Sequence, residues 1–128
     1  ILNASENDIV NALLDLTDGQ GVDVAIDYIS STETLETAAQ ALGKRGRLVT
    51  LGGTGKIFRA NALTMLQKEQ ELMGSRYVTR NEIFEAIELV NKGEIRPLVS
   101  DIRPLEEAEA LHEDLEKGVV IGRAALII

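Results

Sequence analysis

Short apolar runs alternate with amphipathic segments along the chain, and this alternation predicts strands and helices in turn. Two apolar runs, at residues 22–28 and 47–51, predict central strands, because near-continuous apolar runs are typical of strands covered on both faces. The segment between them is long enough for one crossover helix. The two runs therefore predict a β-α-β unit with a right-handed crossover.

Apolar residues at helical spacing predict further helices on both sides of this unit. The predicted helices cover residues 8–16, 32–42, 61–69, 80–92 and 105–117. Ser5 or Asn7 is the expected N-cap of the first helix, and Ser31 or Thr32 that of the second. The fourth helix is expected to bury its apolar side, which consists of Ile83, Phe84, Ile87, Leu89 and Val90.

Weaker strand signals lie at residues 1–4, 71–75, 95–99 and 124–128. Together with the helices they predict an α/β fold with a partial Rossmann-like, doubly wound, mostly parallel sheet and helices on both faces. No linker rich in proline and glycine divides the chain, so residues 1–128 are expected to form a single domain. Because Ile1 lies inside a predicted strand and is not Met, we expect the chain to be a piece of something longer.

Charge and composition narrow the classes of function. The chain has 128 residues and a formal net charge of −8, which argues against nucleic-acid binding. Its apolar runs are too short to span a membrane, and no signal peptide opens the sequence. No cysteine is present, which excludes disulfides and thiolate metal ligands. These features fit a cytoplasmic protein.

Few residues could carry chemistry on their own. His112 is the only histidine, and a metal site needs several ligands, so an ordinary surface histidine is the favoured interpretation. The loop at residues 52–55 holds three glycines, which could let the backbone approach a ligand closely. On composition alone, a flexible connection between strand and helix is the simpler interpretation of that loop.

Seven motifs, taken in order, resemble the medium-chain dehydrogenase/reductase superfamily, and most closely its zinc-containing, NAD(P)-dependent alcohol dehydrogenases. They lie at residues 1–5, 21–27, 46–53, 71–75, 92–98, 105–111 and 122–128. Each motif is weak alone, but their order and spacing extend over essentially the whole chain. The resemblance implies that the chain is the latter half of a nucleotide-binding domain, followed by a C-terminal tail.

The resemblance also implies a set of cofactor contacts at the strand ends. The residues that would flank the adenine are Tyr28, Ile29 and Ser31. Those that would approach the nicotinamide and its ribose are Leu51, Gly52 and Gly53. Backbone groups for the carboxamide would come from Met73, Gly74 and Ser75. Arg123 would reach the ribose or the pyrophosphate, where a guanidinium suits phosphate; the alternative is an ordinary surface arginine.

Several parts that such an enzyme needs are missing from the sequence. The parent would use NAD or NADP, zinc, and a small alcohol or carbonyl substrate, but the glycine-rich pyrophosphate turn, the residue that selects between NAD and NADP, and the zinc ligands are absent. The chain itself therefore contains no catalytic residues and is expected to be inactive. Two alternatives stay open: a fragment of a zinc-free quinone or enoyl reductase, and a non-enzymatic association module with a nucleotide-binding fold.

The family's strand order leads to an expectation about assembly. In the order 3-2-1-4-5-6, strands 1 and 2 would be missing here, which leaves residues 22–28 as an unpaired edge. Either residues 1–4 pair with that edge or a second chain does. A homo-oligomer is therefore expected unless the first strand moves into the vacant place.

Overall fold

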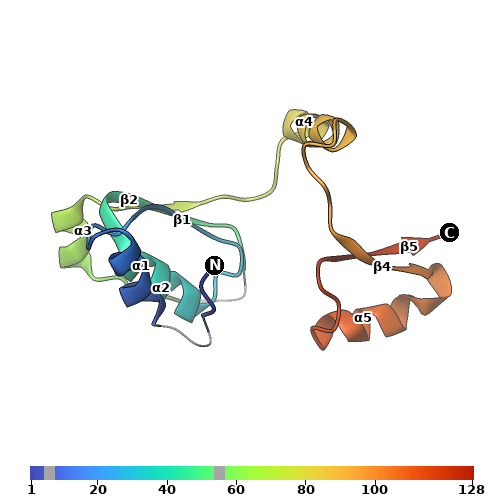
Figure 1. The fold of residues 1–128 in the computed structure, drawn as a ribbon, viewed down its shortest axis with the longest axis horizontal. Coiled ribbons are helices and arrows are strands. Elements are labelled where there is room, and N and C mark those ends of the chain that lie inside the picture. Colours follow the sequence, from blue (N-terminus) through green and yellow to red (C-terminus); the bar gives the residue numbers. More distant parts are fainter. Residues whose placement is uncertain (5–7, 54–56) are drawn as a thin grey trace. The chain divides into compact units, whose positions relative to one another are not determined.

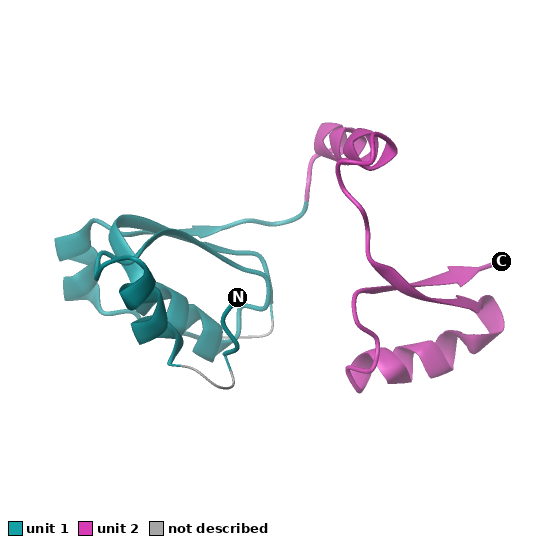
Figure 2. Ribbon diagram, in the orientation of Figure 1, with its two compact units in different colours: residues 1–77 teal, residues 78–128 magenta. Residues whose placement is uncertain are grey.

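The computed structural model describes residues 1–4, 8–53 and 57–128. The chain forms two compact units, Ile1–Tyr77 and Val78–Ile128 (Figure 2). The expectation that both belong to a single domain stays a prediction. Ser5 and Asn7, two expected helix caps, and Thr54 and Gly55 of the glycine-rich loop lie outside the described residues.

The first unit alternates helices with strands (Figure 1). In order, its elements are α1 (Ile9–Leu16), β1 (Val22–Asp27), α2 (Thr32–Ala41), β2 (Leu42–Thr50), α3 (Ala62–Lys68) and β3 (Glu71–Gly74). The three strands form a parallel sheet in the order β1-β2-β3. The α/β class with parallel strands is thus confirmed, and so is the central β-α-β unit.

The sheet register gives this unit one covered face and one open face. Ala25, Leu48 and Leu72 are register partners in neighbouring strands. Leu48 is only 2% exposed and belongs to the small core with Leu35 and Leu42, while Ala25 packs against that core. Because side chains alternate along a strand, the next register row points the other way.

That second row consists of Ile26, Val49 and Met73. Ile26 is 55% exposed and Met73 is 46% exposed. The sheet therefore carries its helices on the face of Ala25 and Leu48.

The predicted strand at residues 1–4 is wrong, since these residues have no strand conformation. Within the described residues, β1 pairs only with β2 and is an edge of the sheet. A strand needs a partner to form, and an apolar pattern alone does not provide one. The first helix is capped by Asp8, whose side chain accepts a hydrogen bond from the Asn11 amide.

The second unit consists of α4 (Arg80–Asn91), β4 (Val99–Pro104), the 3₁₀ turn η1 (Leu105–Glu107), α5 (Ala108–Glu116) and β5 (Arg123–Ile127). Strands β4 and β5 pair in parallel. β4 begins at Val99, whereas the extended segment predicted from the sequence, residues 95–99, ends there. Leu111 of α5 is 3% exposed and anchors this unit.

The expected burial of the apolar side of α4 is not found. Ile83, Phe84 and Ile87 are each about half exposed, and Val90 is 38% exposed. The helical spacing predicted the helix correctly, but it could not tell what would cover the apolar side.

Among the described residues, no helix is long and apolar enough to cross a membrane.

Candidate functional site

A hollow of about 450 Å³ lies at the carboxyl ends of β2 and β3 in the first unit. It is lined by Thr50, Leu51, Gly52, Gly53, Gly74, Ser75, Arg76 and Tyr77. Parallel strands present their carboxyl ends at the same edge of a sheet, and ligands of open α/β sheets bind there. Five of the ten predicted cofactor contacts therefore meet in one place: Leu51, Gly52, Gly53, Gly74 and Ser75.

Three glycines shape the hollow in different ways. A Cβ atom on Gly52 would lie 2.2 Å from the Ile29 carbonyl oxygen, so only glycine allows the two loops to approach this closely. Among the described residues, nothing lies within 4 Å of a Cβ atom placed on Gly53 or Gly74. Gly52 thus serves the packing of the fold, while Gly53 and Gly74 leave room beside the backbone.

The other five predicted contacts do not line the hollow. Tyr28 and Ile29 follow β1 and are 74% and 57% exposed. Ser31 is the N-cap of α2, where its hydroxyl accepts a hydrogen bond from the Thr34 amide. Met73 lies in the exposed row of the sheet, and Arg123 begins β5 in the second unit. Their contacts with a cofactor stay predictions.

Three residues of the hollow were missed by the sequence analysis. Thr50 ends β2, and its carbonyl oxygen accepts a hydrogen bond of 2.9 Å from the Ser75 amide. Arg76 and Tyr77 directly follow Ser75, and the Arg76 guanidinium lies over the Tyr77 ring at 4.7 Å from its centroid. The signal that could have found Arg76 is a cation two residues beyond the end of β3, where an anionic ligand would be expected.

A buried carboxylate lies beside the hollow, at the end of β1. Asp27 is 9% exposed, and burial acts to raise its pKa. Hydrogen bonds from the Ser30 amide, the Thr34 hydroxyl and the Ile29 amide outweigh this effect, so the pKa of Asp27 lies below its usual value. Asp27 is therefore held as a carboxylate by the loop that follows it.

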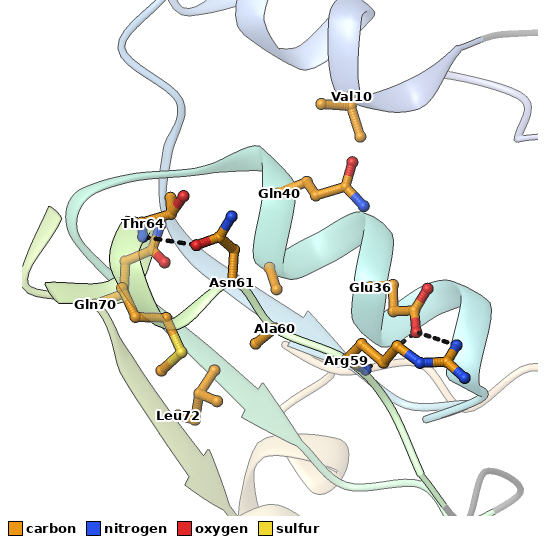
Figure 3. A pocket seen from close by; sticks show the side chains of 11 residues that line it. Val10, Glu36, Gln40, Arg59, Ala60, Asn61, Thr64, Gln70 and Leu72 are labelled. Atoms are coloured by element: carbon orange, nitrogen blue, oxygen red, sulfur yellow. Dashed lines mark hydrogen bonds and ion pairs between the residues drawn. The ribbon is translucent and has the colours of Figure 1, made fainter. Parts of the chain in front are cut away.

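Two more hollows lie among the helices of the first unit. Figure 3 shows one of about 640 Å³ between α2 and α3, with Gln40, Asn61 and Gln70 on its walls. At its rim, Glu36 accepts a hydrogen bond of 3.0 Å from the Arg59 amide. The other hollow, of about 630 Å³, is more apolar and lies between α1, α2 and β1. None of the predicted contacts lines either of them.

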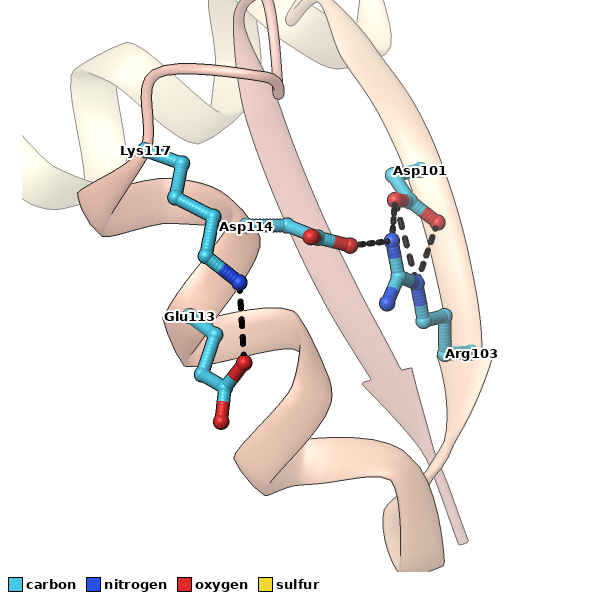
Figure 4. Close-up of polar contacts among 5 residues, drawn as sticks. All are labelled: Asp101, Arg103, Glu113, Asp114 and Lys117. Atoms are coloured by element: carbon cyan, nitrogen blue, oxygen red, sulfur yellow. Dashed lines mark hydrogen bonds and ion pairs between the residues drawn. The ribbon is translucent and has the colours of Figure 1, made fainter.

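The second unit contains a cluster of charged side chains (Figure 4). Arg103 of β4 binds Asp101 on its own strand at 2.6 Å and Asp114 of α5 at 2.7 Å. The hydrogen bond from Arg103 lowers the pKa of Asp101, and the two carboxylates raise that of Arg103. Because Arg103 pairs with one carboxylate on β4 and one on α5, the cluster serves to hold α5 against β4.

Among the described residues, no group of three or more His, Cys, Asp or Glu side chains could hold a metal ion. His112 lies exposed on α5. The side chains that the structure describes therefore do not fit a zinc ion.

Comparison with known proteins identifies the family. Residues 1–92 match the zinc-binding dehydrogenase family. The chain belongs to this family. An NAD-dependent alcohol dehydrogenase of Saccharolobus solfataricus is 30% identical over 127 residues, which are 99% of this chain and 37% of the relative. A D-arabinose 1-dehydrogenase (NADP(+)) of the same organism is 29% identical over 111 residues, 87% of this chain and 32% of the relative.

A solved structure agrees with these relatives. The alcohol dehydrogenase of Aeropyrum pernix superposes with a TM-score of 0.90 at 35% identity, covering 99% of this chain and 36% of that one. The chain thus has the Rossmann-like α/β arrangement of zinc-binding dehydrogenases. It spans about 37% of the length of the alcohol dehydrogenases that it matches.

Proposed function

We propose that this zinc-binding dehydrogenase sequence supplies part of the nucleotide-binding region of an NAD(P)-dependent alcohol dehydrogenase. In this proposal, the hollow at the ends of β2 and β3 receives the nicotinamide end of the cofactor. One observation carries the proposal: Leu51, Gly52, Gly53, Gly74 and Ser75 line a single hollow at the ligand-binding edge of a parallel sheet.

The chemistry of the hollow suits a dinucleotide. Space beside Gly53 and Gly74 lets a planar ring lie close to the backbone, whose amide and carbonyl groups can bind a carboxamide. Arg76 adds a positive charge at the same edge, which suits a phosphate-bearing ligand. When bound, the nicotinamide accepts or delivers a hydride, and the residues of this chain hold and orient it.

Substrate, cofactor preference and assembly belong to the same proposal. The relatives are named for NAD and for NADP(+), so we propose NAD or NADP as the cofactor and an alcohol or carbonyl compound as the substrate of the complete enzyme. Zinc would be held by residues other than those described here. We also propose that the protein is cytoplasmic and forms homo-oligomers.

Titration of the ¹⁵N-labelled chain with NAD and NADP, followed by NMR, tests the cofactor site. We expect weak binding, with a dissociation constant on the order of a millimolar, and shift changes at Gly52, Gly53, Gly74 and Ser75. AMP is the control, because it lacks nicotinamide and should not shift these four amides. Dinucleotide-induced shifts that avoid all four residues would refute the proposed site. An absence of any dinucleotide-induced shift would favour the association module instead.

An activity assay tests whether the chain alone can oxidise alcohols. Because the described residues contain no metal site, the chain should not oxidise primary or secondary alcohols with NAD or NADP. Turnover in a preparation shown to be free of host dehydrogenases contradicts this expectation.

A further inference from the structure

Ser30 has a backbone conformation that few residues other than glycine adopt. Its φ is 55°, in the left-handed region, and its side chain is buried with 4% exposure. Such a conformation costs free energy and persists only where the surroundings hold it in place. The chain therefore keeps a strained residue at the point where β1 gives way to α2.

Asp27 holds this turn. One carboxylate oxygen, Oδ1, accepts hydrogen bonds of 2.9 Å from the amides of both Ile29 and Ser30. The other, Oδ2, accepts one of 2.6 Å from the Thr34 hydroxyl at the start of α2. A single carboxylate thus fixes the turn and the helix that follows it.

The Ser30 hydroxyl connects this turn to the end of the neighbouring strand, β2. Its oxygen accepts a hydrogen bond of 2.9 Å from the Gly52 amide and bonds the Thr50 hydroxyl. The Thr50 carbonyl oxygen in turn accepts the Ser75 amide beyond β3. The network therefore links the ends of all three strands and reaches the backbone of two residues that line the hollow.

We propose that Asp27, Ser30 and Thr50 are positioning residues for the dinucleotide site, acting through the backbone of Gly52 and Ser75. The proposal rests on the proposed function of the hollow. The strained Ser30 turn aims a hydroxyl at Gly52, and the Asp27 carboxylate keeps the turn in that conformation. The Leu51–Gly52 peptide is thereby held in the orientation that the nicotinamide end of the cofactor meets.

Two matched pairs of variants separate the hydroxyl groups from the shape of the site. Ser30→Gly removes the hydroxyl but tolerates the left-handed backbone, whereas Ser30→Ala removes the hydroxyl and keeps a Cβ atom. Thr50→Val removes the other hydroxyl with little change of shape, and Thr50→Ser keeps it. Asp8→Ala is the control for stability, since it removes the cap of α1 without touching the strand ends.

The first measurement is amide hydrogen exchange of Gly52 and Ser75 in the ligand-free chain. Ser30→Gly and Ser30→Ala remove the oxygen that accepts the Gly52 amide. We expect the loss of this hydrogen bond to speed exchange at Gly52 by about tenfold relative to Asp8→Ala. Thr50→Val removes only the hydroxyl that bonds Ser30 and should speed exchange at Gly52 by less. Thr50→Ser should exchange like the wild type. If Gly52 exchanges at the wild-type rate in Ser30→Gly and Ser30→Ala, the network does not hold Gly52 and the proposal fails.

The second measurement is the dissociation constant of NAD from NMR titration of the same variants. The three hydroxyl-deleting variants should bind roughly tenfold more weakly, while Thr50→Ser and Asp8→Ala keep the wild-type value, which a merely structural role would not produce. Unchanged affinity in all variants overturns the positioning role and leaves the proposed function intact. If the wild-type chain shows no NAD-induced shifts, the proposed function fails, and the positioning role fails with it. The exchange data then still decide whether the network orders Gly52.

Discussion

Neighbouring glycines of the hollow have different tasks, although the sequence presents them as one Gly-Gly pair. Gly52 lies against the Ile29 carbonyl, where a Cβ atom has no room, while a Cβ atom on Gly53 would meet none of the described residues within 4 Å. From the sequence, both glycines are expected to be places where a ligand could approach the backbone. Only the loop that follows β1 distinguishes them, and its position depends on contacts between residues more than twenty positions apart.

Substitutions at the two glycines should therefore separate binding from folding. Gly53→Val should weaken NAD binding, because the new side chain occupies the space of the ligand, and should leave the unfolding midpoint unchanged. Gly52→Ala should lower the unfolding midpoint, because its Cβ atom would clash with the Ile29 carbonyl. Calorimetric titration and thermal unfolding of both variants check this. Tight NAD binding that Gly53→Val leaves unaffected contradicts the assigned site.

Asp27 should make the first unit sensitive to acid. Its pKa is lowered in the folded chain, so its contribution to stability is fully present above the unfolded value of about 3.9 and is lost as pH falls through the folded value. Asp27→Asn cannot lose a charge, and its free energy of unfolding should fall less between about pH 5 and pH 3 than that of the wild type. Urea unfolding at several pH values measures the difference. Parallel pH curves for the two proteins contradict it.

Helices and central strands follow closely from the sequence, because their signals are local. The N-cap of α2 is Ser31, one of the two residues expected there, and the helical spacing and the two apolar runs predicted the elements correctly. The start of β2 was not predicted, since β2 begins at Leu42 and the predicted strand began at residue 47. The strand predicted at residues 1–4 is wrong because strand formation is not local: a strand exists only when another strand pairs with it. The left-handed conformation of Ser30 could not be predicted from the sequence either, because a serine does not by itself indicate a positive φ.

One element that the sequence predicted also offers a clean test of local stability. Thr79 and Glu82 form a capping box at the start of α4, with a hydrogen bond of 2.7 Å from the Thr79 amide to Glu82. Thr79→Ala should lower the stability of α4 by about 1 kcal/mol, which hydrogen exchange of the α4 amides reports. Thr79→Ser retains the hydroxyl and is the control. Equal exchange rates in the alanine variant and the wild type would show that the cap does not stabilise this helix.

At the scale of the whole molecule, apolar surface is the main difference between expectation and structure. Periodicity correctly identified the apolar sides of the elements but not what covers them. The apolar side of α4 and the Ile26, Val49 and Met73 row both remain partly exposed within their units. The five residues that do meet in the hollow were predictable, because parallel strands bring their carboxyl ends together whatever surrounds the sheet.

The exposed edge of β1 leads to the last prediction, which concerns self-association. Of the two partners expected for this edge, residues 1–4 do not pair with β1 as a strand, and a second copy of residues 1–128 stays the predicted one. Val24 and Ile26 of β1 are 53% and 55% exposed. Unpaired apolar edge strands recruit further strands. Light scattering should therefore show a mass that rises with protein concentration.

A charge at the centre of this edge should oppose the pairing. Ile26→Lys should reduce association, because a lysine on an edge strand is poorly accommodated when another strand approaches. Leu16→Lys replaces an equally apolar residue, 72% exposed on α1, and controls for the added charge. If wild-type protein stays monomeric at all concentrations, β1 is a stable bare edge and the expected oligomer does not form through it. If both lysine variants reduce association equally, net charge rather than the β1 edge controls it.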